Sequence, residues 1–251
     1  MKLNKLTASL LVASAMAFGS SAHAVTVGGV TWDPNDPIFD FSSQTNLYET
    51  IGINVGDTFS GYGQITAING GSFCSNCQLT YEFGGYTIIK AAAPGDLTFA
   101  ATGGWLKVYV QKTTDVGYTA FSAGTKATAT DGLVWLDLLA APILPGGNTI
   151  AGTVTIPNSN GASGQGTGYF NVVGGLAAYN LDTNSQPGGT DLTYTSSFQP
   201  QNNPVINDGV VVATHFGNNN VFGESIPEPA TLALLGMGLV GLGLARRRKA
   251  A

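Results

Sequence analysis

The residues of this 251-residue chain that could carry chemistry begin with two cysteines, Cys74 and Cys77, in a Cys-Ser-Asn-Cys motif. This spacing is typical of redox motifs, of half of a zinc site, or of a disulfide that closes a short loop. A structural zinc site needs about four ligands. Besides Cys74 and Cys77, the chain beyond its first 24 residues contains one histidine and no other cysteine. We therefore expect a disulfide between Cys74 and Cys77, with a redox motif as the less favoured alternative.

Histidine is the next candidate, because Ser-His-Asp catalysis requires one. His215 is the histidine that remains beyond the first 24 residues, and it follows an apolar run that reads as the end of a strand. The chain has no Gly-x-Ser-x-Gly motif and no glycine motif for phosphates or dinucleotides. We therefore expect His215 to be structural, and we predict no catalytic residues, no metal site, no cofactor and no enzymatic activity.

Carboxylates are numerous, and three of them, Asp33, Asp36 and Asp40, share a short segment with two prolines. Oxygen-rich turns can bind Ca²⁺, but this spacing differs from the EF-hand loop. An Asp/Pro turn is the simpler interpretation. Glycosidases use a pair of carboxylates, but with 15 acidic residues in the chain some pair will lie close by chance.

Aromatic residues could form a sugar-stacking platform on a sheet, although in strands they more often pack in the core or across strands. Tyr109 alternates in phase with Lys107 and Gln111, so it is the aromatic residue that we expect to face solvent. Tyr109 is therefore the candidate glycan contact.

Short strands must position these residues. Leu106, Val108 and Val110 alternate with polar or amphipathic neighbours, a period of two. Similar strand signals are present at residues 79–83, 96–101, 149–156, 169–173, 192–196 and 209–213, with 133–140 readable as a buried strand or a short helix. Gly-Gly pairs separate many of them, as turns do. The pattern predicts an all-β fold, an antiparallel β-sandwich or jelly-roll-like domain.

Composition divides the chain into one domain and its flanks. Residues 25–216 form the predicted β-rich domain, with polar loops expected at 158–168 and 199–208. We predict a linker at 217–225 and a separate C-terminal segment at 226–251.

The N-terminal segment, residues 1–24, has the order of a secretory signal peptide. Lys2 and Lys5 precede an apolar run, and the segment ends in Ala22-His23-Ala24, an A-x-A cleavage site. Cleavage after Ala24 would place the mature body in an oxidising compartment, where disulfides persist.

The C-terminal segment has three parts: Pro227-Glu228-Pro229, an uncharged run at 230–245, and the basic cluster Arg246, Arg247, Arg248 and Lys249. The run is shorter than the ~20 residues that a transmembrane helix needs, and four glycines weaken it as a helix. The basic cluster should stay cytoplasmic by the positive-inside rule. We predict a single, marginal membrane span that serves as a temporary anchor, with an ordinary tail anchor as the alternative.

These three parts resemble the PEP-CTERM sorting signal of Gram-negative bacteria, over about a tenth of the chain. The resemblance implies recognition by an exosortase in the inner membrane, cleavage near Pro227-Glu228-Pro229, and release or transfer to the cell surface. It implies a partner enzyme and a transient membrane contact, and says nothing of what the body does.

The net charge of the predicted domain limits the kinds of partner that it can bind. Residues 25–229 contain four lysines, no arginine and all 15 acids, a net charge of −11. Nucleic-acid binding requires a basic face, so nucleic acid is excluded as a partner. Two functions remain: a non-enzymatic cell-surface or extracellular-matrix protein linked to exopolysaccharide, biofilm or aggregation, and a secreted carbohydrate-binding module.

Overall fold

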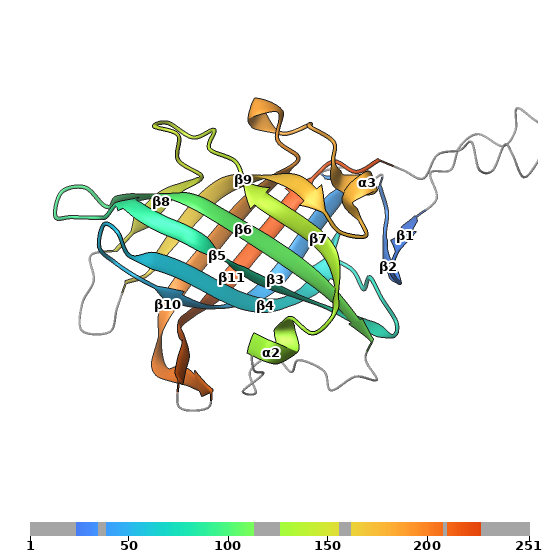
Figure 1. Ribbon diagram of the computed structural model, residues 1–251, viewed down its shortest axis with the longest axis horizontal. Helices are drawn as coiled ribbons and strands as arrows, with labels where there is room; N and C mark the ends of the chain where they lie inside the picture. The colour runs from blue at the N-terminus through green and yellow to red at the C-terminus, as the bar shows by residue number, and fades with distance from the viewer. Residues whose placement is uncertain (1–23, 35–38, 113–125, 156–161, 208–209, 227–251) are drawn as a thin grey trace, which may run out of the picture. The chain divides into compact units, whose positions relative to one another are not determined.

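The computed structural model describes residues 24–34, 39–112, 126–155, 162–207 and 210–226. Strands make up most of this part of the chain (Figure 1). In chain order they are β1 (Val25–Val27), β2 (Val30–Trp32), β3 (Phe41–Ile51), β4 (Thr58–Ile68), β5 (Cys77–Lys90), β6 (Thr98–Lys112), β7 (Leu133–Ala140), β8 (Ile150–Val154), β9 (Gly164–Gly174), β10 (Leu192–Asn207) and β11 (Val210–Gly223). The helical pieces are α2 (Lys126–Ala129), α3 (Ala178–Leu181) and the 3₁₀ turn η1 (Pro187–Gly189).

Strands β3 to β11 form one nine-stranded antiparallel sheet that closes on itself. The order runs β10-β11-β3-β4-β5-β6-β7-β9, and β9 pairs back onto β10, with Phe170 opposite Leu192. Strands β7 and β8 lie one after the other between β6 and β9, each pairing with a different half of both neighbours. The described sheet is therefore barrel-like, and around the closed part each strand is paired on both sides. Beyond the closed part, the far ends of β10 and β11 pair only with each other.

Alternation along the strands fills the interior of this closed sheet. Leu79, Tyr81 and Phe83 of β5 are buried, as are Leu106 and Val108 on β6. Strand β4 leaves room for the two large rings with glycine. A Cβ on Gly63 would lie 2.6 Å from the Tyr81 hydroxyl, and one on Gly61 would lie 2.5 Å from the Phe83 ring. Both glycines accordingly occupy positions where a backbone and a ring approach closely.

The β1–β2 hairpin packs at one end of the closed sheet (Figure 1). Its Trp32 packs edge-to-face on Trp135 of β7 and on Phe41 at the start of β3, with ring centroids 5.8 and 5.9 Å apart. The Trp135 indole donates a hydrogen bond to Val27 O at 2.9 Å. This aromatic cluster fills that end of the core.

Side chains join β3 to β11 where their backbone ladder is interrupted. The ladder pairs Leu47 with Gly217 and resumes at Ser42 with Phe222. Between these points Thr45 Oγ1 donates to Asn219 O and Ser43 Oγ donates to Val221 O, at 2.9 and 3.2 Å. The inward face of β3 is therefore polar because its hydroxyls replace missing backbone partners.

The all-β, antiparallel prediction is confirmed, but the sandwich is wrong in detail because the pairing of β9 with β10 closes one sheet instead of leaving two layers. Residues 133–140 are a strand, β7. The predicted polar loop at 199–208 is largely strand, since β10 continues to Asn207. The predicted linker at 217–225 is corrected as well, because residues 217–223 pair with β10 and β3 inside β11.

Candidate functional sites

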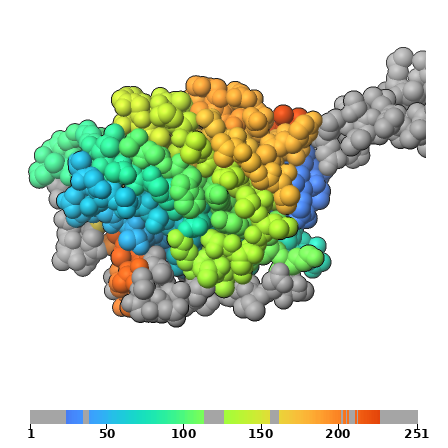
Figure 2. All heavy atoms as spheres, in the orientation of Figure 1, coloured from blue at the N-terminus to red at the C-terminus, as the bar shows by residue number. Residues whose placement is uncertain are grey.

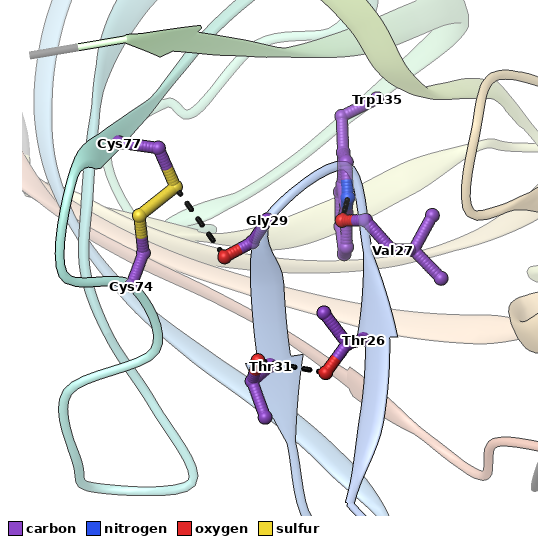
Figure 3. The surroundings of a disulfide bond; sticks show 7 residues. All are labelled: Thr26, Val27, Gly29, Thr31, Cys74, Cys77 and Trp135. Atoms are coloured by element: carbon purple, nitrogen blue, oxygen red, sulfur yellow. Dashed lines mark hydrogen bonds between the residues drawn. A yellow bond between two sulfur atoms is a disulfide. The ribbon is translucent and has the colours of Figure 1, made fainter.

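Cys74, in the loop after β4, and Cys77, the first residue of β5, form the predicted disulfide (Figure 3). Cys77 Sγ contacts Gly29 O, at the turn of the β1–β2 hairpin, at 3.8 Å. In the same loop Phe73 O accepts a hydrogen bond from Thr31 N at 2.8 Å. The disulfide loop therefore supports the hairpin that packs at this end of the sheet, which is a structural role.

His215 lies inside the closed sheet, directly opposite Glu49 of β3 in the β11–β3 register. Its Nδ1 hydrogen-bonds with the Thr214 hydroxyl at 2.8 Å, its ring packs edge-to-face on Phe198, and its Nε2 has no hydrogen-bond partner. Burial lowers the pKa of His215, so the imidazole is neutral at pH 7. The structure therefore places this histidine in the core, beside an acid that the sequence analysis did not single out.

Glu49 is only 4% exposed and points into a cavity at the end of the sheet opposite the hairpin. The cavity has a volume of about 50 Å³ and opens to solvent at its mouth. Its walls are largely apolar, with Ile51, Phe59, Ile88, Phe99, Ile150 and Phe198 among them. Burial raises the pKa of Glu49 to about 8, so the Glu49 carboxyl is protonated in most molecules at pH 7.

This buried acid predicts a pH dependence of stability. Its pKa is about 8 in the folded state and near the ordinary 4.5 in the unfolded chain. The folded state therefore holds the extra proton, and the stability that this proton provides is complete below pH 4.5 and lost as the pH rises to 8. We expect the free energy of unfolding to fall over that interval, relative to Glu49→Gln, by on the order of a few kcal/mol.

Urea unfolding of both proteins between pH 4.5 and 9 measures this difference, and the contribution of His215 cancels because both proteins retain it. A difference that stays constant across the range would show that Glu49 titrates normally and is hydrated. A rise with pH would reverse the sign and contradict the buried, protonated state.

Polar contacts hold Ser225 and Ile226, which follow β11, to the body. Ser225 Oγ accepts a hydrogen bond from the Trp32 indole at 3.1 Å, and Ser225 N donates to Asp40 Oδ2 at 3.2 Å. Asn180 of α3 makes two hydrogen bonds with Ile226. Its backbone carbonyl accepts from Ile226 N at 2.7 Å, and its side-chain amide donates to Ile226 O at 2.9 Å. The body is therefore ordered up to the residue before Pro227, with no spacer in between.

The Asp/Pro segment contributes to this arrangement. Asp36 lies outside the described residues, whereas Asp40 holds Ser225 and the backbone carbonyls of Asp33 and Asp40 both accept hydrogen bonds from the Asn69 amide, at 3.0 and 3.1 Å. Among the described residues no group of three or more His, Cys, Asp or Glu side chains is placed to hold a metal ion. The described ends of the segment, Asp33 and Asp40, therefore make structural polar contacts.

Comparison with protein families identifies the C-terminal segment that follows the body. A family model matches residues 225–249. This segment is a PEP-CTERM protein-sorting motif. The PEP-CTERM motif indicates an exported protein that is sorted by an exosortase. Its first two residues, Ser225 and Ile226, are the ones that the body holds by hydrogen bonds, so the motif begins on the folded domain.

The rest of the motif, including Pro227, Glu228, Pro229 and the basic residues Arg246, Arg247 and Arg248, lies outside the described residues, as do Ala22 of the predicted leader and the span at 230–245. Within the ranges that the structure does describe, no helix has the length and apolarity to cross a membrane. Comparison with curated proteins and with solved structures found no match to the chain.

Tyr109 faces outward from β6, as its alternation predicts, and is half-buried. Glu82 and Asp137 carry ion pairs on the same outer surface, with Lys126 and Lys107 respectively. Burial and then these two acids raise the pKa of Tyr109. Tyr109 therefore presents a neutral hydroxyl, flanked by acids, on the outer surface of β6.

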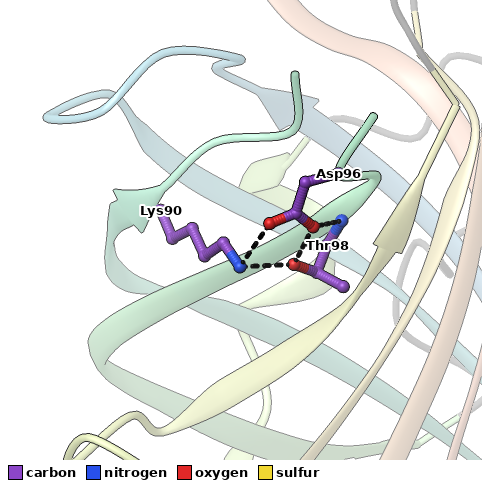
Figure 4. A network of polar contacts seen from close by, with 3 residues as sticks. All are labelled: Lys90, Asp96 and Thr98. Atoms are coloured by element: carbon purple, nitrogen blue, oxygen red, sulfur yellow. Dashed lines mark hydrogen bonds and ion pairs between the residues drawn. The ribbon is translucent and has the colours of Figure 1, made fainter. Parts of the chain in front are cut away.

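The lysines of the exported body are largely neutralised by acids. Lys90 pairs with Asp96 at 2.9 Å and donates to Thr98 Oγ1 at 2.6 Å (Figure 4). These residues fasten the β5–β6 turn, which projects at the edge of the surface view (Figure 2). Since Lys107 and Lys126 are paired too, the acids in excess dominate the charge of the surface.

Proposed function

We propose that this chain is an exported, non-enzymatic protein of the cell surface or extracellular matrix, released by an exosortase from a transient C-terminal membrane anchor. The observation that carries the proposal is the PEP-CTERM motif at residues 225–249. The predicted signal peptide with its Ala22-His23-Ala24 cleavage site supports export. In this role the released body binds exopolysaccharide.

The body suits a protein that persists outside the cell. Among the described strands, closure pairs most of the sheet on both sides, which leaves few edges to which a second copy of the protein could add and opposes aggregation of the protein itself. The Cys74–Cys77 disulfide fits an oxidising compartment. The strong excess of acids would repel anionic polymers, so the matrix partner is a neutral polysaccharide or one bridged by cations.

Deletion of the gene in the host tests the matrix role. We expect the deletion strain to aggregate less and to retain less matrix polysaccharide, and we expect the full-length gene to restore both. A complementing variant with Pro227→Ala and Pro229→Ala should fail to restore them. Unchanged aggregation and polysaccharide in the deletion strain would refute the matrix role and leave the sorting route standing.

A carbohydrate-binding function is the alternative, and a groove on the outer surface favours it. The groove lies over β3, β10 and β11 and is lined by Tyr48, Phe216 and the amide side chains Asn46, Gln199 and Asn218. Phe216 is 36% exposed. An accessible ring beside several amides can stack on a sugar and bond to its hydroxyls.

Binding of neutral oligosaccharides on a glycan array tests this alternative. Phe216→Ala should abolish binding if the groove is the site, and Tyr109→Ala should abolish it if the site lies on β6. Binding that survives both substitutions would exclude both surfaces, and a blank array would favour the matrix role without direct sugar recognition.

A further inference from the structure

The cavity beside Glu49 contains a polar group that the protein leaves unsatisfied. Glu49 Oε1 is buried and has no hydrogen-bond partner. Buried polar atoms are nearly always bonded, because an unpartnered one loses its hydration without compensation. The carboxyl also points into a space that opens to solvent, so a ligand can reach it.

The neighbours of Glu49 do not supply the missing partner. Gly61, opposite it on β4, has no side chain, and His215, opposite it on β11, bonds through Nδ1 to Thr214. Tyr194 and Ser196 of β10 line the same cavity, and the Tyr194 hydroxyl interacts with Ser196 and Asn219. The hydrogen-bonding capacity of the Glu49 carboxyl is thus directed at the cavity.

The residues that line the cavity determine the charge and polarity that a ligand must have. Beyond Glu49, Tyr194 and Ser196, the residues that line the cavity are apolar or glycine, and none of the described ones is a cation. An anionic ligand would find no counter-charge there and would be repelled by the acidic body. A cationic head group would find a carboxyl, and a short hydrocarbon chain would find Phe59, Phe99 and Ile150.

We propose that this cavity binds a small apolar primary amine, with its ammonium group on the Glu49 carboxyl and its hydrocarbon chain between the Ile and Phe side chains of the mouth. The volume of about 50 Å³ restricts the buried part to the head group and a short chain, and longer chains extend into the open mouth. The site does not depend on the sorting route or on the glycan groove.

Occupancy by an ammonium would change the protonation of Glu49. The empty site holds a neutral carboxyl at pH 7 because burial raises the pKa of Glu49 to about 8. The ammonium stabilises the carboxylate, so the carboxyl proton leaves to solvent when the amine binds. Tyr194, whose pKa burial raises, and neutral His215 keep their protonation states, so the release is close to one proton per amine.

Isothermal titration of the purified full-length protein with n-butylamine at pH 7, in two buffers of different ionisation enthalpy, measures affinity and proton release together. We expect saturable binding with release of nearly one proton, and weaker binding of n-butanol and butyrate. Glu49→Gln should weaken butylamine binding roughly tenfold or more and remove the proton release. Glu82→Gln, an acid on the outer surface, is the matched control and should bind as the wild type does.

Ala92→Trp keeps Glu49 and fills the mouth, so it should block binding even if Glu49→Gln fails to fold. The proposal is overturned if butanol binds as tightly as butylamine, if no proton is released, if Glu49→Gln binds unchanged, or if the wild type takes up no amine.

Discussion

Replacing Pro227 and Pro229 together by Ala will leave the exported protein uncut in the membrane, with near-complete loss of the released form. Two prolines exclude a helix across the triplet and keep it extended. Alanine is the strongest helix former, so the substitutions allow the apolar segment at 230–245 to extend upstream as helix. Because Asn180 holds Ile226 on the body, no spacer residue separates that helix from the folded domain. The exosortase would then meet a helix in place of an extended substrate.

Immunoblots of medium and membrane fractions measure this outcome. Pro200→Ala with Pro204→Ala is the matched control, since both prolines lie in β10 and outside the motif. The control should be released as the wild type is. Release of the Pro227/Pro229 variant at the wild-type size and amount would contradict the role given to the triplet.

The second large effect is a loss of stability when Trp135 is replaced by Ala. This side chain is fully buried, its ring lies 5.8 Å from Trp32 and 6.0 Å from Phe41, and its indole holds Val27 O. Trp135→Ala removes the centre of that aromatic cluster and the hydrogen bond to the β1–β2 hairpin. We expect a loss of about 3–5 kcal/mol in the free energy of unfolding.

Urea unfolding monitored by circular dichroism measures this loss. Leu139→Ala is the control on the same strand, because Leu139 is 52% exposed and should cost less than about 1 kcal/mol. A cost for Trp135→Ala as small as that of the control would mean that the hairpin end of the sheet is not part of the cooperative core.

Local patterns made much of the fold predictable. Alternation in β6 and the frequent Gly-Gly turns identified an antiparallel, all-β domain, and the Cys-Ser-Asn-Cys motif identified a loop disulfide. Closure was not predictable, because it depends on the pairing of β9 with β10 and on β7 and β8 sharing one position in the sheet. Such partner choice is set by packing between segments and leaves no periodic trace in either one.

Strand β3 and its acid were missed for a definite physical reason. Ser43, Thr45 and Glu49 occupy the inward face, so the usual contrast of apolar inside and polar outside is lost. The hydroxyls belong there because they bond to β11 across the interrupted ladder. The available signal was the alternation of side chains over residues 41–51, and it gives Glu49 no distinction from a surface acid.

The intact mass of the protein recovered from the medium of its host tests the central claim most directly, that this is an exported body cut free from its C-terminal anchor. Exosortase sorting predicts a chain that begins at Val25 and ends close to Pro227-Glu228-Pro229, and it predicts that this species disappears when the exosortase gene is deleted. A released chain that still carries Arg246 to Lys249, or release that does not depend on the exosortase, would contradict the account.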